Sequence, residues 1–320
     1  MSALELVLIG VGGWFAFNMG ASGLAPSFGA AMGARLIGQR RAALLFGVFV
    51  VAGALLFGSH VAKTLAAGMV PNTTFDVKTT LIVLLASNIA LFLANVFAIP
   101  QSTSWVTVAA IVALGVQRGN LTPDTLTHRL LPAWVILPTI AFVLSTVAVR
   151  LTYPLATGWS LHTWFSKRTT LLRALALASA CYVALAIGAN NVANAVGPLS
   201  AAHVLDIATG FWLLAPLFGL GAFVLGGPAR TIARDVVPLG LLTATLCNVI
   251  VASLLIVASR MGIPQSLVQL NAAAVLGVAL IKEGPSGMFY GRSTRRMLLF
   301  WVITPILAAI LTTLGLNIFR

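Results

Sequence analysis

The chain has 320 residues, of which 59% are hydrophobic and only 8% are charged, and its mean hydropathy is +1.03. Soluble domains carry about 25% charged residues, so this chain has too few polar side chains to cover a soluble fold of this size. The net charge of +13 does not indicate a nucleic-acid partner, because the basic residues lie in short loops between apolar runs. We therefore expect an all-α polytopic membrane protein whose solvent is the lipid bilayer.

Long apolar runs fill the chain from its first residues. A bilayer-spanning helix needs about 20 apolar residues, and several of the runs are slightly short. No Ala-x-Ala cleavage signal follows the first run, so we expect a retained helix and not a signal peptide. The clearest runs are 4–19, 42–57, 79–98, 130–149, 171–187, 211–225, 236–258 and 297–314.

The two halves of the chain share four landmarks in the same order, at offsets of 168, 167, 164 and 167 residues. Four matches at a nearly constant offset indicate an internal duplication. We expect a first transmembrane repeat over 1–150, a cytoplasmic linker over 151–173 and a second repeat over 174–320. The paired landmarks are Gly20-Ala21-Ser22-Gly23 with Gly188-Ala189-Asn190-Asn191, Lys63-Thr64 with Arg230-Thr231, Pro100-Gln101-Ser102 with Pro264-Gln265-Ser266, and Trp134 with Trp301.

The loops predict how the chain lies in the membrane. Thirteen of the 19 Lys and Arg residues fall on one side when the loops alternate, and that side should be cytoplasmic. Both termini then face outward. Each repeat crosses an odd number of times, so the second copy is inverted relative to the first. We expect interrupted helices, and two hairpins whose Pro100 and Pro264 tips meet near the membrane midplane, where such transporters hold their substrates.

The motif residues resemble the inorganic phosphate transporter (PiT) family, whose duplicated hallmark is Gly-Ala-Asn-Asp-Val-Ala-Asn. The second copy reads Gly-Ala-Asn-Asn-Val-Ala-Asn over 188–194, and the first reads Gly-Ala-Ser-Gly-Leu-Ala-Pro over 20–26. The family's hairpin motif Pro-Val-Ser-Thr-Thr-His corresponds to 100–105 and 264–269. The resemblance covers nearly the whole chain and implies anion uptake coupled to a cation in a bacterial cytoplasmic (inner) membrane.

The departures from that family motif concern its aspartates. These are Gly23 in the first copy and Asn191 in the second, so both carboxylates are replaced. Ionised carboxylates only accept hydrogen bonds, whereas Asn, Ser and backbone N–H groups donate. A site without carboxylates favours sulfate, which has no proton to donate, over protonated phosphate. The pattern resembles the sulfate-permease branch of the family; thiosulfate or a related dianion and phosphate stay open as alternatives.

The candidate substrate-binding residues lie at the duplicated motifs and at the hairpin tips. Serine at a helix start places its hydroxyl beside free backbone N–H groups, which suits an anion. The competing interpretation is structural, because Ser and Thr in membrane helices often bond their own backbone and Gly-Ala stretches often pack helices. The candidates are Ser22, Gly23, Asn190, Asn191, Asn194, Gln101, Ser102, Thr103, Ser104, Gln265 and Ser266.

Other functional classes fit the sequence less well. Four scattered His and six acidic residues provide no catalytic set, so we expect neither an enzyme nor a metal or cofactor site. An anion channel or exporter is compatible with the motifs. Sodium could bind to Asn and Ser oxygens and freed carbonyls, whereas the sulfate-permease resemblance favours a proton as the coupling ion, if only weakly. No motif demands a homodimer, which remains open.

Overall fold

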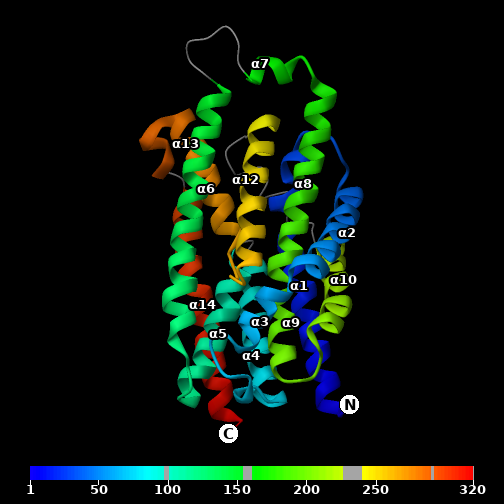
Figure 1. The fold of residues 1–320 in the computed structure, drawn as a ribbon, viewed down its shortest axis with the longest axis vertical. Helices are drawn as coiled ribbons and strands as arrows, with labels where there is room; N and C mark the ends of the chain where they lie inside the picture. The colour runs from blue at the N-terminus through cyan, green and yellow to red at the C-terminus, as the bar shows by residue number, and fades with distance from the viewer. Residues whose placement is uncertain (97–100, 154–160, 226–239, 290–291, 320) are drawn as a thin grey trace.

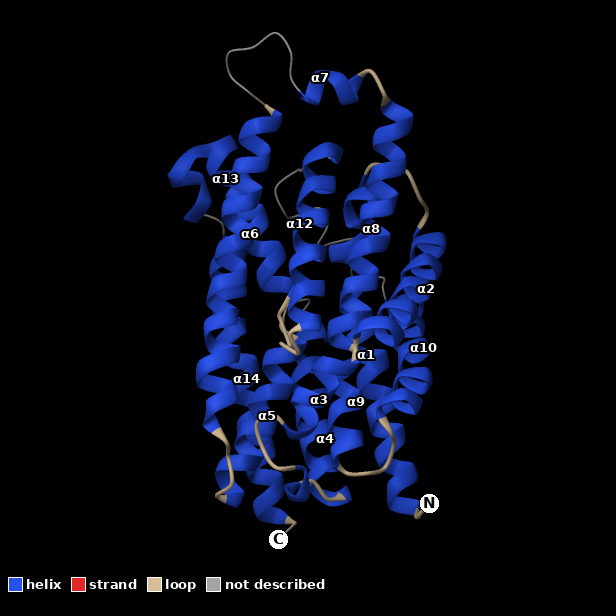
Figure 2. Cartoon of the chain, in the orientation of Figure 1, coloured by secondary structure: helices blue, strands red, loops and turns tan. Residues whose placement is uncertain are grey.

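The computed structural model describes residues 1–96, 101–153, 161–225, 240–289 and 292–319; for 161, 225, 285–289 and 292–300 it describes the backbone alone. The described chain is helical throughout, and its helices form one elongated bundle (Figures 1 and 2). The helices are α1 (Ala3–Gly33), α2 (Gln39–Phe57), α3 (Ser59–Ala67), α4 (Val77–Val96), α5 (Thr103–Arg118), α6 (Leu131–Thr152), α7 (Leu161–Ser166), α8 (Thr169–Asn191), α9 (Ala193–Ala201), α10 (Ile207–Leu225), α12 (Leu241–Arg260), α13 (Leu267–Phe289) and α14 (Arg292–Ile318).

Nine described helices are long and apolar enough to span a membrane, which confirms the polytopic prediction. Eight correspond to the predicted apolar runs. The ninth covers 267–284 within α13, a segment that polar residues at its start had concealed. Exposed Leu, Ile, Val and Phe side chains cover the outside of the bundle, as expected of a surface that faces lipid tails.

The repeat motifs lie on two long helical spans. In the first half α1 runs through its motif as one helix of 31 residues with Pro26 inside it. In the second half α8 and α9 meet at Val192, whose backbone stays helical (φ −61°, ψ −31°), and together they form one span over Thr169–Ala201. Each copy of the motif therefore lies within a continuous helical span.

Glycine residues bring the helices of the two halves into backbone contact. A Cβ added at Gly20 of α1 would lie 1.9 Å from the Phe218 carbonyl oxygen of α10, and one at Gly188 of α8 would lie 2.0 Å from the Val50 carbonyl oxygen of α2. The partners reciprocate, because a Cβ at Gly221 would lie 1.8 Å from the Phe17 oxygen and one at Gly53 would lie 1.8 Å from the Leu185 oxygen. Each crossing thus excludes any side chain larger than hydrogen.

The two crossings are counterparts under the sequence duplication. Each residue of the α1–α10 crossing lies 168 positions from a residue of the α2–α8 crossing: Gly20 and Gly188, Phe17 and Leu185, Phe218 and Val50, Gly221 and Gly53. The halves therefore exchange partners, with α1 of the first half on α10 of the second and α8 of the second on α2 of the first. An inverted duplication predicts this exchange, and the inversion itself stays a prediction.

The termini lie together at one end of the bundle, and α7 and the start of α8 lie at the other (Figure 1). The predicted linker 151–173 includes the last residues of α6, all of α7 and the first turn of α8. Two of the sequence landmarks, Pro100 and the Arg230-Thr231 pair, fall outside the described residues.

The glycine crossings predict an unequal response to alanine within α1. Gly20→Ala should lower the melting temperature in detergent, because its methyl group forces two backbones apart, and overpacking costs about 1–3 kcal/mol. Gly10→Ala is the matched control, since no atom lies within 4 Å of a Cβ there, and alanine stabilises helices relative to glycine. Equal melting temperatures for the two variants would show that the crossing tolerates separation.

Candidate functional site

Asn190, near the end of α8, ties that helix to the turn between α12 and α13. Its Nδ2 donates to the Ser259 Oγ at 3.0 Å and to the Ile263 carbonyl at 3.0 Å. Its Oδ1 accepts from the backbone N–H of Gln265 at 2.9 Å. The side chain is fully buried and both ends of the amide are engaged, so Asn190 holds the Gln265 turn in place.

Asn194, in the first turn of α9, reaches the start of α5. Its Nδ2 lies 3.3 Å from the Thr103 Oγ1 and 3.4 Å from the Ser104 Oγ. The Ser104 hydroxyl donates in turn to the Gln265 carbonyl at 3.3 Å. The start of α5 and the turn before α13 therefore meet in the interior of the bundle, next to the junction of α8 and α9.

These contacts define a central polar cluster, which consists of Thr103, Ser104, Asn190, Asn194 and Gln265. All five side chains are at most 5% exposed. The structure brings together, from four separate segments, residues that the motifs placed at distant points of the sequence.

Several buried polar atoms in and beside the cluster have no hydrogen-bond partner among the described residues. Both amide atoms of Gln265 and the Oδ1 of Asn194 belong to this group. Such an atom costs about 1–3 kcal/mol when it stays unpaired, so these atoms are free to bond a polar ligand or water. The side-chain oxygens of Gln101, Asn191 and Gln269 are likewise buried and unpartnered.

Ser102 and Ser266 cap the two helices that lead away from the cluster. The Ser102 Oγ accepts from the Trp105 N–H at 3.2 Å, and the Ser266 Oγ accepts from the Gln269 N–H at 3.3 Å. Serine at these helix starts was predicted from the sequence. Because capping uses the oxygen as an acceptor, each hydroxyl keeps its proton available as a donor.

Other predicted residues lie apart from the hydrogen bonds of the cluster. The Ser22 hydroxyl donates to the Met19 carbonyl of its own helix at 2.8 Å, which is the structural role weighed above for such residues. A Cβ at Gly23 would lie 2.5 Å from Cζ of Phe46. The Gln101 amide donates to the Leu91 carbonyl at 2.9 Å.

Carboxylates are absent from the cluster and from every buried position that the structure describes. Three of the six acidic residues instead lie at helix starts, where Glu5 pairs with Ser2, Asp76 with Thr79 and Asp206 with Thr209. Hydrogen bonds from Thr209 lower the pKa of Asp206. The cluster is therefore neutral and offers hydroxyl and amide groups alone.

A second set of buried amides escaped the sequence analysis. Asn18 of α1 donates to the Asn88 Oδ1 of α4 at 2.8 Å, and Asn95 of α4 donates to the Asn18 Oδ1 at 2.8 Å. The signal was present, since three asparagines stand in runs that are otherwise apolar. Trp134 of α6 was a sequence landmark but not a site candidate; its Nε1 donates to the Pro264 carbonyl at 2.9 Å and supports the same turn as Asn190.

Two cavities lie elsewhere in the described part of the protein. One of about 600 Å³ lies between α2 and α10, and one of about 410 Å³ lies against α1 and α10. No residue of the central polar cluster lines either of them. The cluster residues touch one another directly, so a ligand reaches them only if these segments separate.

The sequence was compared with known families and proteins. A profile described as "Phosphate transporter family" matches residues 19–312. The sulfate permease CysP of Bacillus subtilis is 33% identical over 99% of this chain and 88% of its own length. A putative phosphate permease of Methanocaldococcus jannaschii is 24% identical over 96% of this chain and 94% of its own length.

The fold was compared with solved structures. A structure titled "The sodium-dependent phosphate transporter" superimposes with a TM-score of 0.88 and covers 99% of both chains. The two sequences are 20% identical, so this likeness concerns the fold alone.

The contacts of Asn190 predict a specific loss in Asn190→Ala. The variant leaves the Gln265 N–H and the Ile263 carbonyl without their partner, at about 1–3 kcal/mol for each buried group, so both melting temperature and anion uptake should fall. Thr139→Ala is the control, because Thr139 is exposed and bonds only its own helix. Wild-type stability and uptake in Asn190→Ala would contradict the bracing role.

Proposed function

This chain belongs to the phosphate transporter family, and from that membership we propose that it imports sulfate by cation symport. Its family and its relatives are transporters and not enzymes, and the same holds for this chain. We propose a bacterial cytoplasmic membrane as its location, with both termini outside. The loop charges support that orientation. Both termini lie at one end of the bundle (Figure 1), so they share one side of the membrane.

The central polar cluster supports an oxyanion as the substrate. Its hydroxyl and amide groups can donate several hydrogen bonds within a space from which lipid and water are excluded. A buried site that matches its ligand group for group rejects an unmatched one strongly, because each unpaired polar group costs free energy. The unpartnered amide of Gln265 is the single observation that carries this proposal most directly.

Sulfate is favoured over phosphate by the absence of carboxylates. A carboxylate accepts a hydrogen bond from protonated phosphate but faces sulfate with an acceptor and a like charge. Here the aspartate positions hold Gly23 and Asn191, and no described acidic residue is buried. The sulfate permease among the relatives agrees with this preference. Phosphate is the second candidate, because other relatives are named as phosphate permeases.

Coupling to cations follows from the charge of the substrate. Moving one charge across 100 mV is worth about 2.3 kcal/mol, so importing a dianion into a negative interior costs about 4.6 kcal/mol before any concentration gradient. Two monovalent cations neutralise the transported charge, and three or more make the membrane potential a driving force. A passive channel would release the anion outward.

The nature of the cluster bears on which cation is used. The sulfate-permease resemblance favours a proton, but a proton needs a titratable group near the substrate, and the described core contains no buried carboxylate, histidine or lysine. Sodium binds several neutral oxygens, and unpartnered amide oxygens occur at Asn191, Asn194 and Gln265. We therefore propose sodium ahead of the proton.

Transport then requires the start of α5 and the turn before α13 to separate, so that the cluster opens to each side of the membrane in turn. In the present arrangement the Ser104–Gln265 hydrogen bond joins them, and Trp134 of α6 holds the turn before α13 through the Pro264 carbonyl. The glycine crossings on the other side of the bundle provide fixed contacts between the halves. We propose that α5 and α13 move against this frame, as one part of a transporter moves against the other in alternating access.

Competition for uptake tests the substrate. In vesicles reconstituted with the purified protein, unlabelled thiosulfate or selenate should suppress labelled sulfate uptake, because both are unprotonated dianions of similar geometry. Phosphate at equal concentration should suppress it far less. Abolition by phosphate, with no effect of thiosulfate or selenate, would establish the second candidate instead.

The variant Asn191→Asp tests the same proposal from the protein side. A carboxylate there should weaken sulfate uptake by repulsion, and it should improve competition by phosphate. Thr139→Ala again serves as the control for general damage. Unchanged sulfate affinity and rate in Asn191→Asp would remove position 191 from the argument.

Separate control of sodium and pH tests the coupling ion. Sulfate uptake at constant pH should rise with external sodium and should depend little on an imposed pH gradient. Uptake that follows the pH gradient and ignores sodium would show that the proton is the partner. Measuring uptake against membrane potential then distinguishes two cations per dianion from three.

A further inference from the structure

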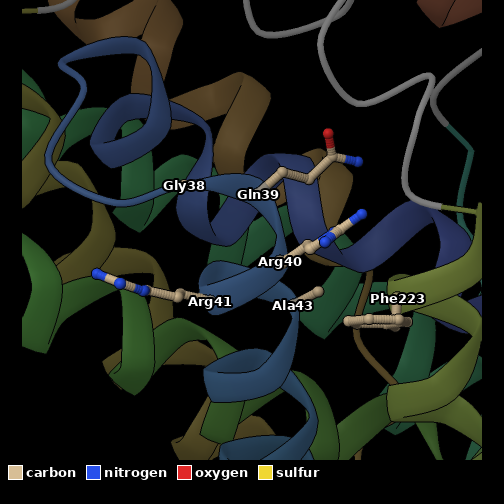
Figure 3. Close-up of a pocket in the computed structure, with 6 residues that line it drawn as sticks. All are labelled: Gly38, Gln39, Arg40, Arg41, Ala43 and Phe223. Atoms are coloured by element: carbon tan, nitrogen blue, oxygen red, sulfur yellow. The ribbon is translucent and has the colours of Figure 1, made fainter.

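A cavity of about 600 Å³ lies between the first turn of α2 and the last turn of α10 (Figure 3). It lies apart from the central polar cluster and shares no residue with it. Its lining residues are Gly38, Gln39, Arg40, Arg41, Ala43 and Phe223.

The cavity exists because α2 and α10 diverge beyond a close contact. The helices touch at Gly47 and Gly219, where a Cβ on Gly47 would lie 3.5 Å from the Gly219 Cα. Ala43 precedes Gly47 by one turn, and Phe223 follows Gly219 by one turn. Since Ala43 and Phe223 line the same cavity, the two helices run in opposite directions and separate toward the cavity.

The cavity is positively charged. Arg40 and Arg41 are both exposed, and neither forms an ion pair with a described carboxylate. The Arg40 side chain lies on the same side of α2 as Phe223, whereas Arg41 extends from the opposite side of the turn (Figure 3). The first turn of α2 contains no acidic residue, and cations at a helix start are disfavoured by the helix dipole. Helix stability therefore does not explain these two arginines.

An apolar surface continues from the cavity along both helices. Leu44 and Val48 of α2 are 61% and 64% exposed, and Val224 of α10 is 59% exposed. In a membrane such side chains face acyl chains, while Arg40 stands at the level where the polar headgroups begin. A charged pocket above an apolar helix face matches a phospholipid in both of its parts; Leu220 and Phe223 complete the exposed apolar face on α10.

We propose that this cavity binds the headgroup of an anionic phospholipid, with Arg40 on the phosphate and the acyl chains along the exposed faces of α2 and α10. Basic pockets between transmembrane helices are suited to such headgroups. The site is independent of which anion the protein transports. Its ligand would brace the cavity next to the glycine contact between the two halves.

Native mass spectrometry of the full chain in detergent tests the site, with phosphatidylglycerol and phosphatidylcholine as probes. The wild type should retain phosphatidylglycerol in preference, and Arg40→Ala should weaken its binding about fivefold, as expected for one basic residue at a membrane surface. Arg173→Ala is the matched control, since it removes an exposed arginine of α8 that does not line the cavity. Equal retention of the two lipids, or an equal loss in both variants, would overturn the proposal.

Two further experiments use the wild-type protein alone, so they do not depend on whether a variant folds. They distinguish a bound lipid from a bound free anion. A photoactivatable phosphatidylglycerol should crosslink to the wild type within peptides that contain 38–43 or 220–224. Inorganic phosphate or sulfate at millimolar concentration should leave phosphatidylglycerol binding unchanged. Crosslinks elsewhere, or displacement of the lipid by the free anions, would show that the cavity is not a lipid site.

Discussion

Backbone contact at the two glycine crossings is the constraint on which this arrangement depends. Because α1 meets α10 and α8 meets α2 without an intervening side chain, the pairs that carry the duplicated motifs are held at the shortest distance that helices allow. Membrane helices cannot rely on the hydrophobic effect to associate, so such packing supplies much of their attraction. The α1–α10 and α8–α2 pairs thus form a rigid frame that carries the motifs, and the α5 and α13 segments pack around this frame.

Amide side chains connect that frame to the more loosely held segments. In one half Asn190 binds Ser259 and the turn before Gln265, and in the other half Asn18 binds Asn88 and Asn95. Ser259 and Asn95 lie 164 positions apart, the same offset as the two Pro-Gln-Ser turns. Both halves therefore join their motif helix to a hairpin through a buried amide, although the partners differ in detail.

The sequence predicted the membrane class and the helical runs because composition and run length follow directly from the lipid solvent. It also predicted that the 188–194 motif and the hairpin starts would gather, since the duplication placed them in matching positions. It could not distinguish Asn190, which braces a turn with both ends of its amide, from Gln265, whose amide is buried without a partner. That distinction depends on which neighbours lie within hydrogen-bond distance, and only the packed structure determines it. Gly23 shows the same limit, since the ring that faces it belongs to Phe46 of another helix.

The contact between Gly23 and Phe46 limits how the anion preference of this protein could evolve. A side chain at position 23 would meet the tip of the buried Phe46 ring at 2.5 Å, so that ring would have to shift or be replaced, and truncating a buried phenylalanine costs about 3–5 kcal/mol. Position 191 is partly exposed and carries a side chain of nearly the same shape as aspartate. A lineage could therefore regain an acidic group in the second repeat without repacking, whereas in the first repeat the same change requires the buried Phe46 ring to give way.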